Sequence, residues 1–445
     1  MGRRRAVALI GAFAVAGGVM LLPTAASATE HRDGYEKVGY FTNWTTGDPR
    51  NFTIKDLVRN GQAGRMTVLN YAFGNVNSAG RCFEDNEPGG GDSLDDYQRT
   101  FTAAQSVNGR ADKPGQALAG NFNQLRQLKE RYPDLRVQIS IGGWTFSKYF
   151  SDAVLTDQAR KAFVASCIDL FIKGNLPKVG TDPHGGKGAA AGVFDGIDID
   201  WEWPASPGND GNVVRDVDKQ NFTLMLAEFR RQLDEYGEHD GLRKHYSLTA
   251  FLSADPAQVE KGYEVSKVFR ILDFGTVQGY DLHGNWEDVT NHQSALFTPK
   301  GEPAQPDFTV DRAINAFITR GAPRSKLVMG VPFYGYGWTG VPNVNHGLFQ
   351  QAAATLPGSG DNGYEDYRNL AKLPAQGFKI YRDEQAGFSW LYNGTDFWTF
   401  DDPVVLGWKT RYIRQKGLGG AMVWSLDADD SDGSLFKALD RGLCG

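Results

Sequence analysis

Three carboxylates occupy alternate positions in one short apolar run of this chain. The run is FDGIDIDWEWP, residues 194–204, and the carboxylates are Asp198, Asp200 and Glu202. Ile, Trp and Phe between Gly and Pro are typical of a strand, in which side chains alternate between two faces. The three carboxylates therefore share one face, about 6.6 Å apart. Like charges at this spacing raise at least one pKa, as a general acid near neutral pH requires.

The bulky side chains of the run are expected on the other face: Ile197, Ile199, Trp201 and Trp203. A row of acids is costly on a buried strand, so chemistry explains it better than packing does. Carboxylates also suit Mg²⁺ or Ca²⁺. However, no EF-hand spacing follows the run, and no His lies nearby in the sequence. The pattern therefore predicts catalytic carboxylates, with no metal ion and no cofactor.

Short apolar segments alternate with helical patterns along the rest of the chain. The expected strands are 37–44, 66–74, 136–142, 194–203, 246–253, 274–280, 327–334 and 420–427. Helical patterns between them cover 122–132, 157–173, 218–236, 256–271 and 310–320. Eight alternating strand and helix units predict an α/β fold, a closed (β/α)8 TIM barrel over residues 35–445.

Two segments interrupt this alternation. Residues 337–392, between the seventh and eighth strands, contain Gly, Pro, many aromatic residues and short β-like pieces such as 378–382. Because this segment is too long for a βα loop, it predicts a small α+β insertion domain that deepens one side of the active-site cleft. Residues 84–114 are rich in Gly and Asp, and they form either a loop at the rim of the cleft or a plain surface loop.

The N-terminus has the pattern of a secretory signal peptide. Arg3–Arg5 form a charged region, residues 6–22 are apolar, and Ala26–Ala28 supplies the small residues of a cleavage site. We expect residues 1–28 to be removed and the mature protein to be secreted into the extracellular space. No second hydrophobic span occurs in the sequence, so no membrane attachment is expected after cleavage.

The composition argues against a nucleic-acid partner and favours a carbohydrate. The formal net charge is −6 and the sequence has no basic stripe, so nucleic-acid binding is not expected. Ten Trp residues fit a carbohydrate groove, because flat indoles stack on sugar rings, although some of them must fill the core. The protein is expected to act as a monomer.

Cys82, Cys167 and Cys444 allow one intramolecular disulfide at most, and the sequence does not decide which pair forms it.

In a TIM barrel the active site lies at the C-terminal ends of the strands. Polar, aromatic and acidic residues follow seven of the expected strands, at 39–44, 70–73, 140–144, 198–202, 278–286, 332–334 and 422–425. A barrel without a site would not need them. Phe41, Phe73 and Phe333 are assigned to packing.

Two of these segments carry a family resemblance. The pattern Asp-x-x-Asp-x-Asp-x-Glu, from Asp195 to Glu202, resembles the signature of glycoside hydrolase family 18, the chitinases. Ser140–Gly143, SIGG, is similar to the second signature of that family. The resemblance covers essentially the whole mature chain. It implies a secreted chitinase that binds chitin and N-acetylglucosamine oligosaccharides and hydrolyses their β-1,4 bonds with retention, through the 2-acetamido group of the substrate.

The resemblance also implies roles for the catalytic residues. Glu202 would be the general acid and base. Asp200 would hold and orient the 2-acetamido group, and Asp198 beneath it would share a proton with it. Tyr280 would donate a hydrogen bond to the acetamide carbonyl. Asp195 has the wrong parity to face the barrel interior with the other acids, so a structural role is expected for it.

The substrate-binding residues follow from the same resemblance. Asp281 would contact the sugar before the cleaved bond, and Trp424 would form the hydrophobic base beneath that sugar. Trp144 and Trp286 would stack on sugars at the leaving-group side. The other residues expected to line the substrate-binding site are Tyr40, Ser140, Gly143, Gln278 and Tyr334.

This chain departs from the family pattern at two positions. Many members carry Met at the position of Gln278 and Arg at the position of Tyr336. Gln278 changes the surface beneath the acetamide group, and Tyr336 removes a charged contact to a sugar. Both changes bear on fine substrate preference, and neither affects Glu202.

Two other functions are compatible with the same fold. A non-catalytic chitin-binding lectin usually lacks the acid, whereas Glu202 is present here. An endo-β-N-acetylglucosaminidase that trims N-glycans would share the carboxylates and the mechanism, but the long insertion and the Trp residues favour a linear chitin chain.

A second acidic cluster follows the eighth strand and consists of Asp427, Asp429, Asp430 and Asp432. These carboxylates could bind Ca²⁺. We expect them instead to bend the loop and cap the last helix near Ser434.

Overall fold

The structure is a computed structural model that describes residues 34–444 except for 87–90, 240–242, 305–306 and 361. The expected signal peptide, residues 1–28, lies outside the described residues. Within the part that is described, no helix combines the length and the apolar character needed to cross a membrane.

Eight parallel strands close into a barrel. They are β1 (Glu36–Thr42), β2 (Val68–Val76), β4 (Arg136–Gly142), β5 (Gly196–Asp200), β6 (Ser247–Leu252), β7 (Phe274–Val277), β8 (Leu327–Pro332) and β15 (Gly420–Trp424). The strand order is β1-β15-β8-β7-β6-β5-β4-β2, and β1 also pairs with β2, which closes the barrel. The (β/α)8 TIM barrel and all eight predicted strands are therefore confirmed. A short strand, β3 (Cys82–Phe83), pairs with β2 in antiparallel fashion.

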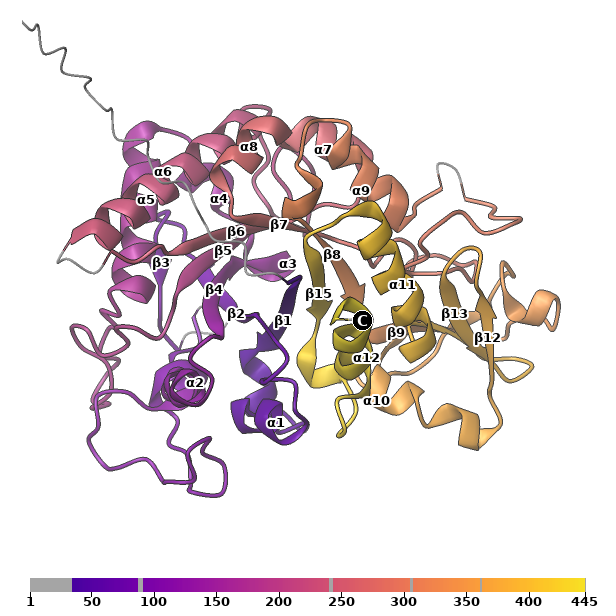
Figure 1. Cartoon of the computed structure of the whole chain (residues 1–445), viewed down its shortest axis with the longest axis horizontal. Helices are drawn as coiled ribbons and strands as arrows, with labels where there is room; N and C mark the ends of the chain where they lie inside the picture. The colour runs from indigo at the N-terminus through magenta and orange to yellow at the C-terminus, as the bar shows by residue number, and fades with distance from the viewer. Residues whose placement is uncertain (1–33, 87–90, 240–242, 305–306, 361, 445) are drawn as a thin grey trace, which may run out of the picture. The chain divides into compact units, whose positions relative to one another are not determined.

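Helices follow the strands and lie on the outside of the barrel (Figure 1). They are α1 (Ile54–Arg59), α2 (Gly120–Arg131), α3 (Gly143–Phe146), α4 (Phe150–Ala153), α5 (Asp157–Cys167), α6 (Asp218–Glu238), α7 (Pro256–Gly262), α8 (Val265–Ile271), α9 (Val310–Ile318), α11 (Pro403–Lys416) and α12 (Ser434–Cys444). Shorter helical turns are η1 (Asn43–Thr46), η2 (Leu94–Gln98), η3 (Ile168–Ile172), η5 (Arg324–Lys326) and η8 (Leu426–Ala428).

The single helix predicted over 256–271 is wrong, because the structure has two helices there. Tyr263 has extended backbone (φ −129°, ψ 131°) and separates α7 from α8. Its buried ring packs against Phe222 and Phe317 at centroid distances of 5.3 and 5.9 Å. Burial of this ring in the helix layer favours the break over a continuous helix.

The apolar side chains form two clusters. The larger cluster lies between the strands and the helices and includes Ile197, Ile199 and Trp201. The second cluster includes strand residues such as Val38 of β1 and continues into the insertion. Trp203 belongs to this second cluster and packs on Phe251 at a centroid distance of 5.5 Å. The prediction that Trp203 shares a face with Trp201 is wrong, because Trp203 lies beyond the last strand residue, Asp200, and packs in the other cluster.

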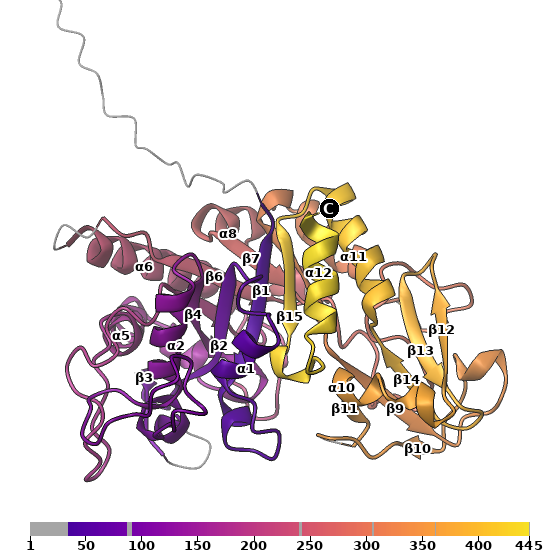
Figure 2. The same cartoon turned by 60° about the horizontal axis from the view of Figure 1, so that its bottom comes forward.

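The insertion between β8 and β15 forms its own antiparallel sheet. Its elements are β9 (Tyr334–Thr339), η6 (Asn345–Gly347), β10 (Ala354–Thr355), β11 (Tyr364–Asp366), α10 (Tyr367–Leu370), η7 (Leu373–Gln376), β12 (Lys379–Asp383), β13 (Phe388–Tyr392) and β14 (Phe397–Phe400). The order is β10-β9-β14-β13-β12, with β11 on β9. The sheet extends beyond the expected bounds 337–392 at both ends, because β9 starts two residues after β8 and β14 adds a further strand. In Figures 1 and 2 it lies beside α11 and α12, on the other side of the barrel from α5 and α6.

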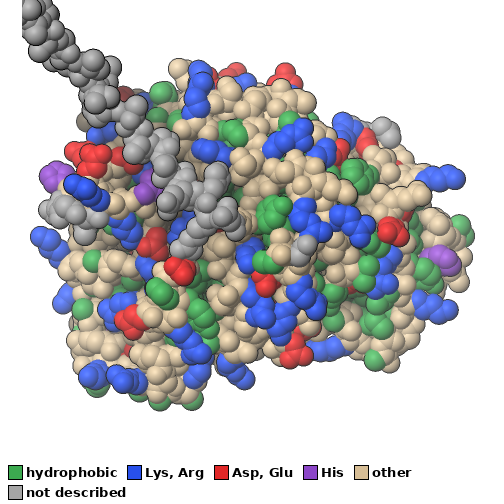
Figure 3. Space-filling view, in the orientation of Figure 1, with side chains coloured by type: hydrophobic (Ala, Val, Ile, Leu, Met, Phe, Trp, Pro, Cys, Tyr) green, Lys and Arg blue, Asp and Glu red, His purple; other side chains and the backbone are tan. Residues whose placement is uncertain are grey.

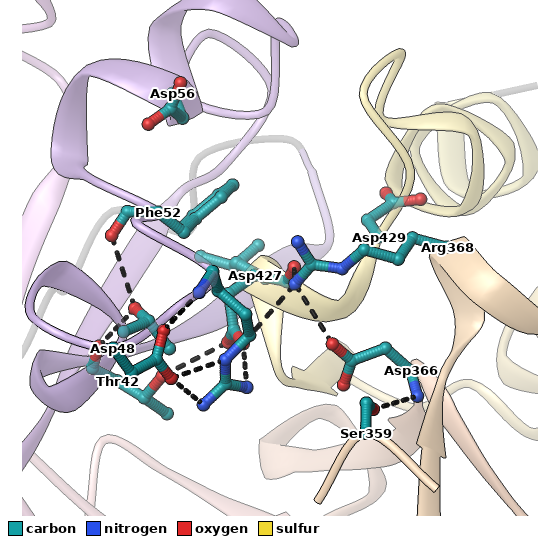
Figure 4. Close-up of polar contacts among 12 residues, drawn as sticks. Thr42, Asp48, Phe52, Asp56, Ser359, Asp366, Arg368, Asp427 and Asp429 are labelled. Atoms are coloured by element: carbon teal, nitrogen blue, oxygen red, sulfur yellow. Dashed lines mark hydrogen bonds and ion pairs between the residues drawn. The ribbon is translucent and has the colours of Figure 1, made fainter.

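Ion pairs connect the insertion to the barrel (Figure 4). Asp427, just after β15, accepts hydrogen bonds from Thr42 and Arg50. Arg368 of α10 donates to the Asp427 carbonyl and pairs with Asp366 at 3.1 Å. These contacts join β1, β15 and the insertion at one point.

Two acids of this loop, Asp429 and Asp430, cap the last helix, as expected. Asp429 accepts hydrogen bonds from the backbone N–H groups of Leu435 and Phe436, at 3.1 and 3.0 Å. Asp430 accepts one from Ser434 N–H at 3.0 Å. Carboxylates in this position satisfy the free N–H groups of the first helical turn.

A disulfide joins Cys82 of β3 to Cys167 of α5 and closes a loop with a sequence separation of 85. Cys444 is the remaining thiol and is exposed. The structure thus selects one of the three possible pairs.

On the face of the molecule in Figure 3, Lys and Arg side chains are spread over the surface with Asp and Glu among them.

Candidate active site

Asp198 is held at the bottom of the site by three hydroxyl groups. Its carboxylate is fully buried inside the barrel and accepts hydrogen bonds from Tyr40 on β1 (2.7 Å), Ser140 on β4 (2.8 Å) and Thr249 on β6 (2.6 Å). Burial raises the pKa of Asp198, and the three donors oppose this rise. Burial, with the charge of Asp198, raises the pKa of Tyr40 well above its usual value, so Tyr40 remains a donor.

Asp200 and Glu202 are neighbouring carboxyl groups that follow Asp198 in the row. Burial is the main cause that raises the pKa of Asp200 well above its usual range, and the charges of Glu202 and Asp198 add to it. Burial also raises the pKa of Glu202 to about 8, with a contribution from the charge of Asp281. The pair therefore retains a proton at neutral pH, as a general acid must.

Asp200 carries a buried oxygen that is available to a ligand. Asp200 Oδ1 is buried and has no hydrogen-bond partner among the residues that the structure describes. A buried carboxylate oxygen normally has a donor, so Oδ1 is suited to receive an N–H group of a ligand.

The backbone around Glu202 is fixed by polar contacts that the sequence did not reveal. Glu202 N–H donates to Ser147 Oγ at 2.8 Å, and Asn212 Nδ2 donates to the Glu202 carbonyl at 2.9 Å. Ser147 Oγ also lies within hydrogen-bond distance of the Gly143 and Asp200 carbonyls. Ser147 and Asn212 are in loops, where no periodic pattern indicates a role.

Two glycines let the β4 loop approach the carboxylate row. Gly142 has φ +114°, and a Cβ there would lie 2.2 Å from the Asp200 carbonyl oxygen. Gly143 has φ +77°, and a Cβ there would lie 2.6 Å from the Phe73 ring. The SIGG segment thus contains Gly where only Gly fits.

Tyr280 and Asp281 follow β7 at the same end of the barrel. The Tyr280 ring stacks on Phe251 at 6.2 Å, and burial with the charge of Asp281 raises its pKa well above the usual value, so its hydroxyl stays protonated. Asp281 accepts hydrogen bonds from Tyr334 and Tyr336 of β9. Gln278 is half-buried, and its backbone N–H donates to the Leu252 carbonyl.

Aromatic rings surround these polar groups. Trp424 packs against Tyr40 (5.3 Å) and Phe73 (5.7 Å), and Phe73 also stacks on Trp44 (6.2 Å). The prediction that Phe73 only fills the core is incomplete, because it is half-buried and lies against Gly143 at the site. Trp286 is 58% exposed and lies beside the Tyr336 ring.

Two of the residues singled out lie outside this polar network. Trp144, in α3, is 51% exposed. Asp195 is at the other end of β5, where it accepts hydrogen bonds from Lys129, Lys244 and the N–H of Val137. Its role is structural, as its parity predicted.

Comparison with known proteins places the chain in a family. The family model "Glycosyl hydrolases family 18" matches residues 36–429. Chitinase A1 of Niallia circulans is 34% identical over 91% of this chain and 58% of its own length, and Chitinase 63 of Streptomyces plicatus is 36% identical over 92% and 60%. The chain thus spans about three fifths of the length of these two relatives.

A solved structure agrees with the sequence matches. The catalytic domain of psychrophilic chitinase B from Arthrobacter TAD20 superposes with a TM-score of 0.87 at 43% identity, over 92% of this chain and 95% of that one. The family match includes all eight barrel strands and the carboxylate row. The chain therefore belongs to glycosyl hydrolase family 18.

Proposed function

We propose that this protein is a chitinase that hydrolyses β-1,4 bonds between N-acetylglucosamine units. The observation that carries the proposal is the row Asp198, Asp200 and Glu202, with a buried Glu202 whose pKa is raised to about 8. Three relatives with chitinase in their names, at 34–43% identity, support the substrate class. The exposed Trp rings beside the row provide stacking surfaces for sugars.

The proposed reaction proceeds with retention through the substrate's own acetamide group. Glu202 donates its proton to the glycosidic oxygen as the bond to the anomeric carbon breaks. The acetamide carbonyl oxygen attacks that carbon and forms a cyclic oxazolinium ion. Glu202 then removes a proton from water, which opens the ring and regenerates the acid.

Asp200 and Tyr280 would hold the acetamide during the attack. The free Oδ1 of Asp200 is suited to accept the acetamide N–H, which stabilises the positive charge of the oxazolinium. The Tyr280 hydroxyl, kept protonated by burial, would donate to the carbonyl oxygen. Asp198, whose pKa is raised by burial, would share a proton with Asp200 above it, while its three hydroxyl partners hold its carboxyl group in place. The mechanism requires N-acetyl groups, so cellulose should not react.

We also propose that the protein is secreted after cleavage of residues 1–28. The supporting observations are the charged, apolar and small-residue segments at the N-terminus and the Cys82–Cys167 disulfide. Disulfides persist mainly in oxidising compartments outside the cytosol.

The test compares the wild type with Glu202→Gln on a defined N-acetylglucosamine hexamer. Products are identified by mass, and the anomeric ratio is measured early in the reaction. The wild type should release shorter oligomers with the β-anomer in excess, and Glu202→Gln should lose at least about 100-fold in rate. Glu260→Gln is the matched control, because the Glu260 side chain is 76% exposed, and it should react as the wild type does.

Other results would favour the alternatives. Binding of the hexamer without cleavage would indicate a lectin. Release of glycans from a glycoprotein, with the hexamer left intact, would indicate an endo-β-N-acetylglucosaminidase. An early excess of the α-anomer would contradict the retaining mechanism.

A further inference from the structure

Three buried side chains converge in the connection between β7 and α9. His283, His292 and Glu302 each contribute one potential ligand atom, and the three atoms lie within 4.8 Å of one another. Their side chains are 1%, 0% and 1% exposed. The two His Nε2 atoms and Glu302 Oε2 have no hydrogen-bond partner among the described residues. Buried polar atoms without partners are rare, so this group needs an explanation.

The other ring nitrogen of His283, Nδ1, already has a partner, the carboxylate of Glu287. Its Nδ1 lies 3.0 and 3.1 Å from the two carboxylate oxygens of Glu287, four residues later in the sequence. A proton on Nδ1 satisfies this contact and leaves the lone pair of Nε2 directed at the cluster. A carboxylate behind a His is the usual arrangement around metal-binding imidazoles, because it sets the tautomer and the ring orientation.

The Glu302 carboxylate is oriented in the same way. Its Oε1 accepts hydrogen bonds from Asn291 Nδ2 and from the N–H of Ala304, both at 2.9 Å. Its Oε2 is left facing His292 Nε2 at 3.3 Å. Glu302 and Glu287 together bring two negative charges to two imidazoles, which a divalent cation would balance.

We propose that His283, His292 and Glu302 bind a zinc ion. Two imidazole nitrogens and one carboxylate oxygen are ligands that Zn²⁺ accepts, with a fourth position left for water. In tetrahedral coordination, bonds of about 2.0–2.2 Å place ligand atoms about 3.3–3.6 Å apart, so atoms that now lie within 4.8 Å of one another close around the ion with shifts below about 1 Å each. The spacing of these residues in the sequence matches no common zinc motif, which is why the sequence alone predicts no metal.

The alternative is a proton-mediated pair between His292 and Glu302. The N–H of Ala295 lies 3.3 Å from His292 Nδ1, which would favour a proton on Nε2. This pair does not account for the whole cluster, because His283 Nε2 would stay buried without a partner. Zinc gives all three atoms a partner and places the proton of His292 on Nδ1, at the expense of the long contact with Ala295.

The proposed zinc site lies in the loop that carries Asp281 and Trp286. His283 follows Asp281 by two residues and precedes Trp286 by three, so the ion would anchor the loop that carries both. The ring of His292 packs on Phe388 of β13 at 5.4 Å, and the loop thereby contacts the insertion sheet. A zinc ion here would brace this loop, and no step of the proposed hydrolysis requires it.

The test measures zinc directly in the full chain. The wild type, His292→Gln and Glu302→Gln are stripped with a chelator, equilibrated with ZnCl₂, desalted and analysed for bound zinc, and the affinity and Tm are measured with added zinc. We expect one zinc ion per wild-type chain and an increase in Tm on binding. Each variant should bind at least tenfold more weakly and lose the increase. His245→Gln, whose side chain is 50% exposed and away from the cluster, should behave as the wild type.

If a variant fails to fold, crystals of the wild type still test the zinc proposal. Zinc-soaked crystals of the wild type should then give an anomalous peak between His283, His292 and Glu302. A wild type that binds no zinc, variants that retain it, or a peak only at other positions would overturn the proposal. A wild type without zinc whose variants are destabilised would establish the proton-mediated pair instead. These readouts do not depend on activity, so the proposed function stands or fails separately.

Discussion

The hydroxyl of Tyr336 lies 2.8 Å from Asp281 Oδ1 and donates a hydrogen bond to it. Tyr334, two residues earlier on the same face of β9, donates to the same oxygen. Both donors are uncharged, and Tyr336 is the position at which this chain departs from the Arg of the family pattern. The Asp281 carboxylate is thus stabilised without a cation, and its negative charge contributes to the raised pKa of Glu202.

This arrangement predicts the alkaline limit of activity. Glu202 must be protonated to act as an acid, so kcat/KM should fall as the pH rises through its pKa of about 8. Asp281→Asn removes a negative charge, which lowers the pKa of Glu202 and moves the alkaline limb down by about 0.5–1 pH unit. The measurement is the pH dependence of kcat/KM on a chitin oligosaccharide.

The control for this prediction is Tyr336→Phe. It removes one hydrogen bond and leaves the carboxylate of Asp281 in place. We expect a lower kcat/KM with an alkaline limb closer to that of the wild type than to that of Asp281→Asn. An alkaline limb unmoved in Asp281→Asn would show that another group controls it.

The buried acid should lower the stability of the folded protein at neutral pH. The pKa of Glu202 is about 8 in the folded protein, against an ordinary value of 4.5 for Glu, so the folded state binds the proton more tightly than the unfolded chain does. Below pH 4.5 both states are protonated and no penalty exists. As the pH rises from 4.5 to about 8 the unfolded state loses its proton first. The free energy of unfolding therefore falls over this range, by at most about 5 kcal/mol.

Glu202→Gln should therefore be more stable than the wild type near pH 8 and nearly equal to it near pH 4. Gln cannot ionise, so it removes the pH-dependent penalty while it keeps the size of the side chain. Urea denaturation at both pH values gives the difference in the free energy of unfolding. Glu260→Gln is the control at an exposed position and should show little gain at either pH. A gain for Glu202→Gln that is equal at both pH values would contradict the assignment to this ionisation.

The barrel was predictable from sequence because its strands leave a strong local pattern. Buried parallel strands are short apolar runs, and the carboxylate row at 198–202 interrupts one of them at alternate positions. The alternation fails only at Trp203, which is past the last strand residue, Asp200. The break between α7 and α8 at Tyr263 was missed for a different reason. The Tyr263 ring packs against other helices, and this packing overrides the local helical pattern.

Contacts between distant segments were not predictable. Thr249 pairs in register with Asp198 and donates to it, but a Thr within a strand carries no sign of this partner. Ser147 and Asn212 act on the Glu202 backbone from loops. The three cysteines allow three pairings, and only the packing of β3 against α5 selects Cys82 with Cys167.

The disulfide predicts a specific loss of stability. It closes a loop with a sequence separation of 85, so Cys82→Ser should lower the free energy of unfolding by up to about 4.5 kcal/mol, through the entropy of the unfolded chain. Tm measured with and without a reductant checks this in the wild type and the variant. Cys444→Ser is the control, because Cys444 is exposed and outside the disulfide, and it should match the wild type. Equal Tm values for the wild type in both conditions would show that the bond does not stabilise the fold.

The exposed Trp side chains predict a dependence on substrate length. Trp286 is 58% exposed beside Tyr336, so its loss should leave the fold intact and remove a surface on which a sugar of the leaving group can stack. Trp286→Ala should lower kcat/KM about three- to tenfold for the hexamer, at an unchanged Tm, as expected for about 0.5–1.5 kcal/mol of ring stacking. A chromogenic disaccharide does not reach that far and should be hydrolysed at nearly the wild-type rate. Phe297→Ala is the matched control, since Phe297 is 42% exposed but packs on Tyr412 of α11, outside the barrel. Equal losses on both substrates would mean that Trp286 positions Asp281 or the catalytic row, and that it does not bind a distant sugar.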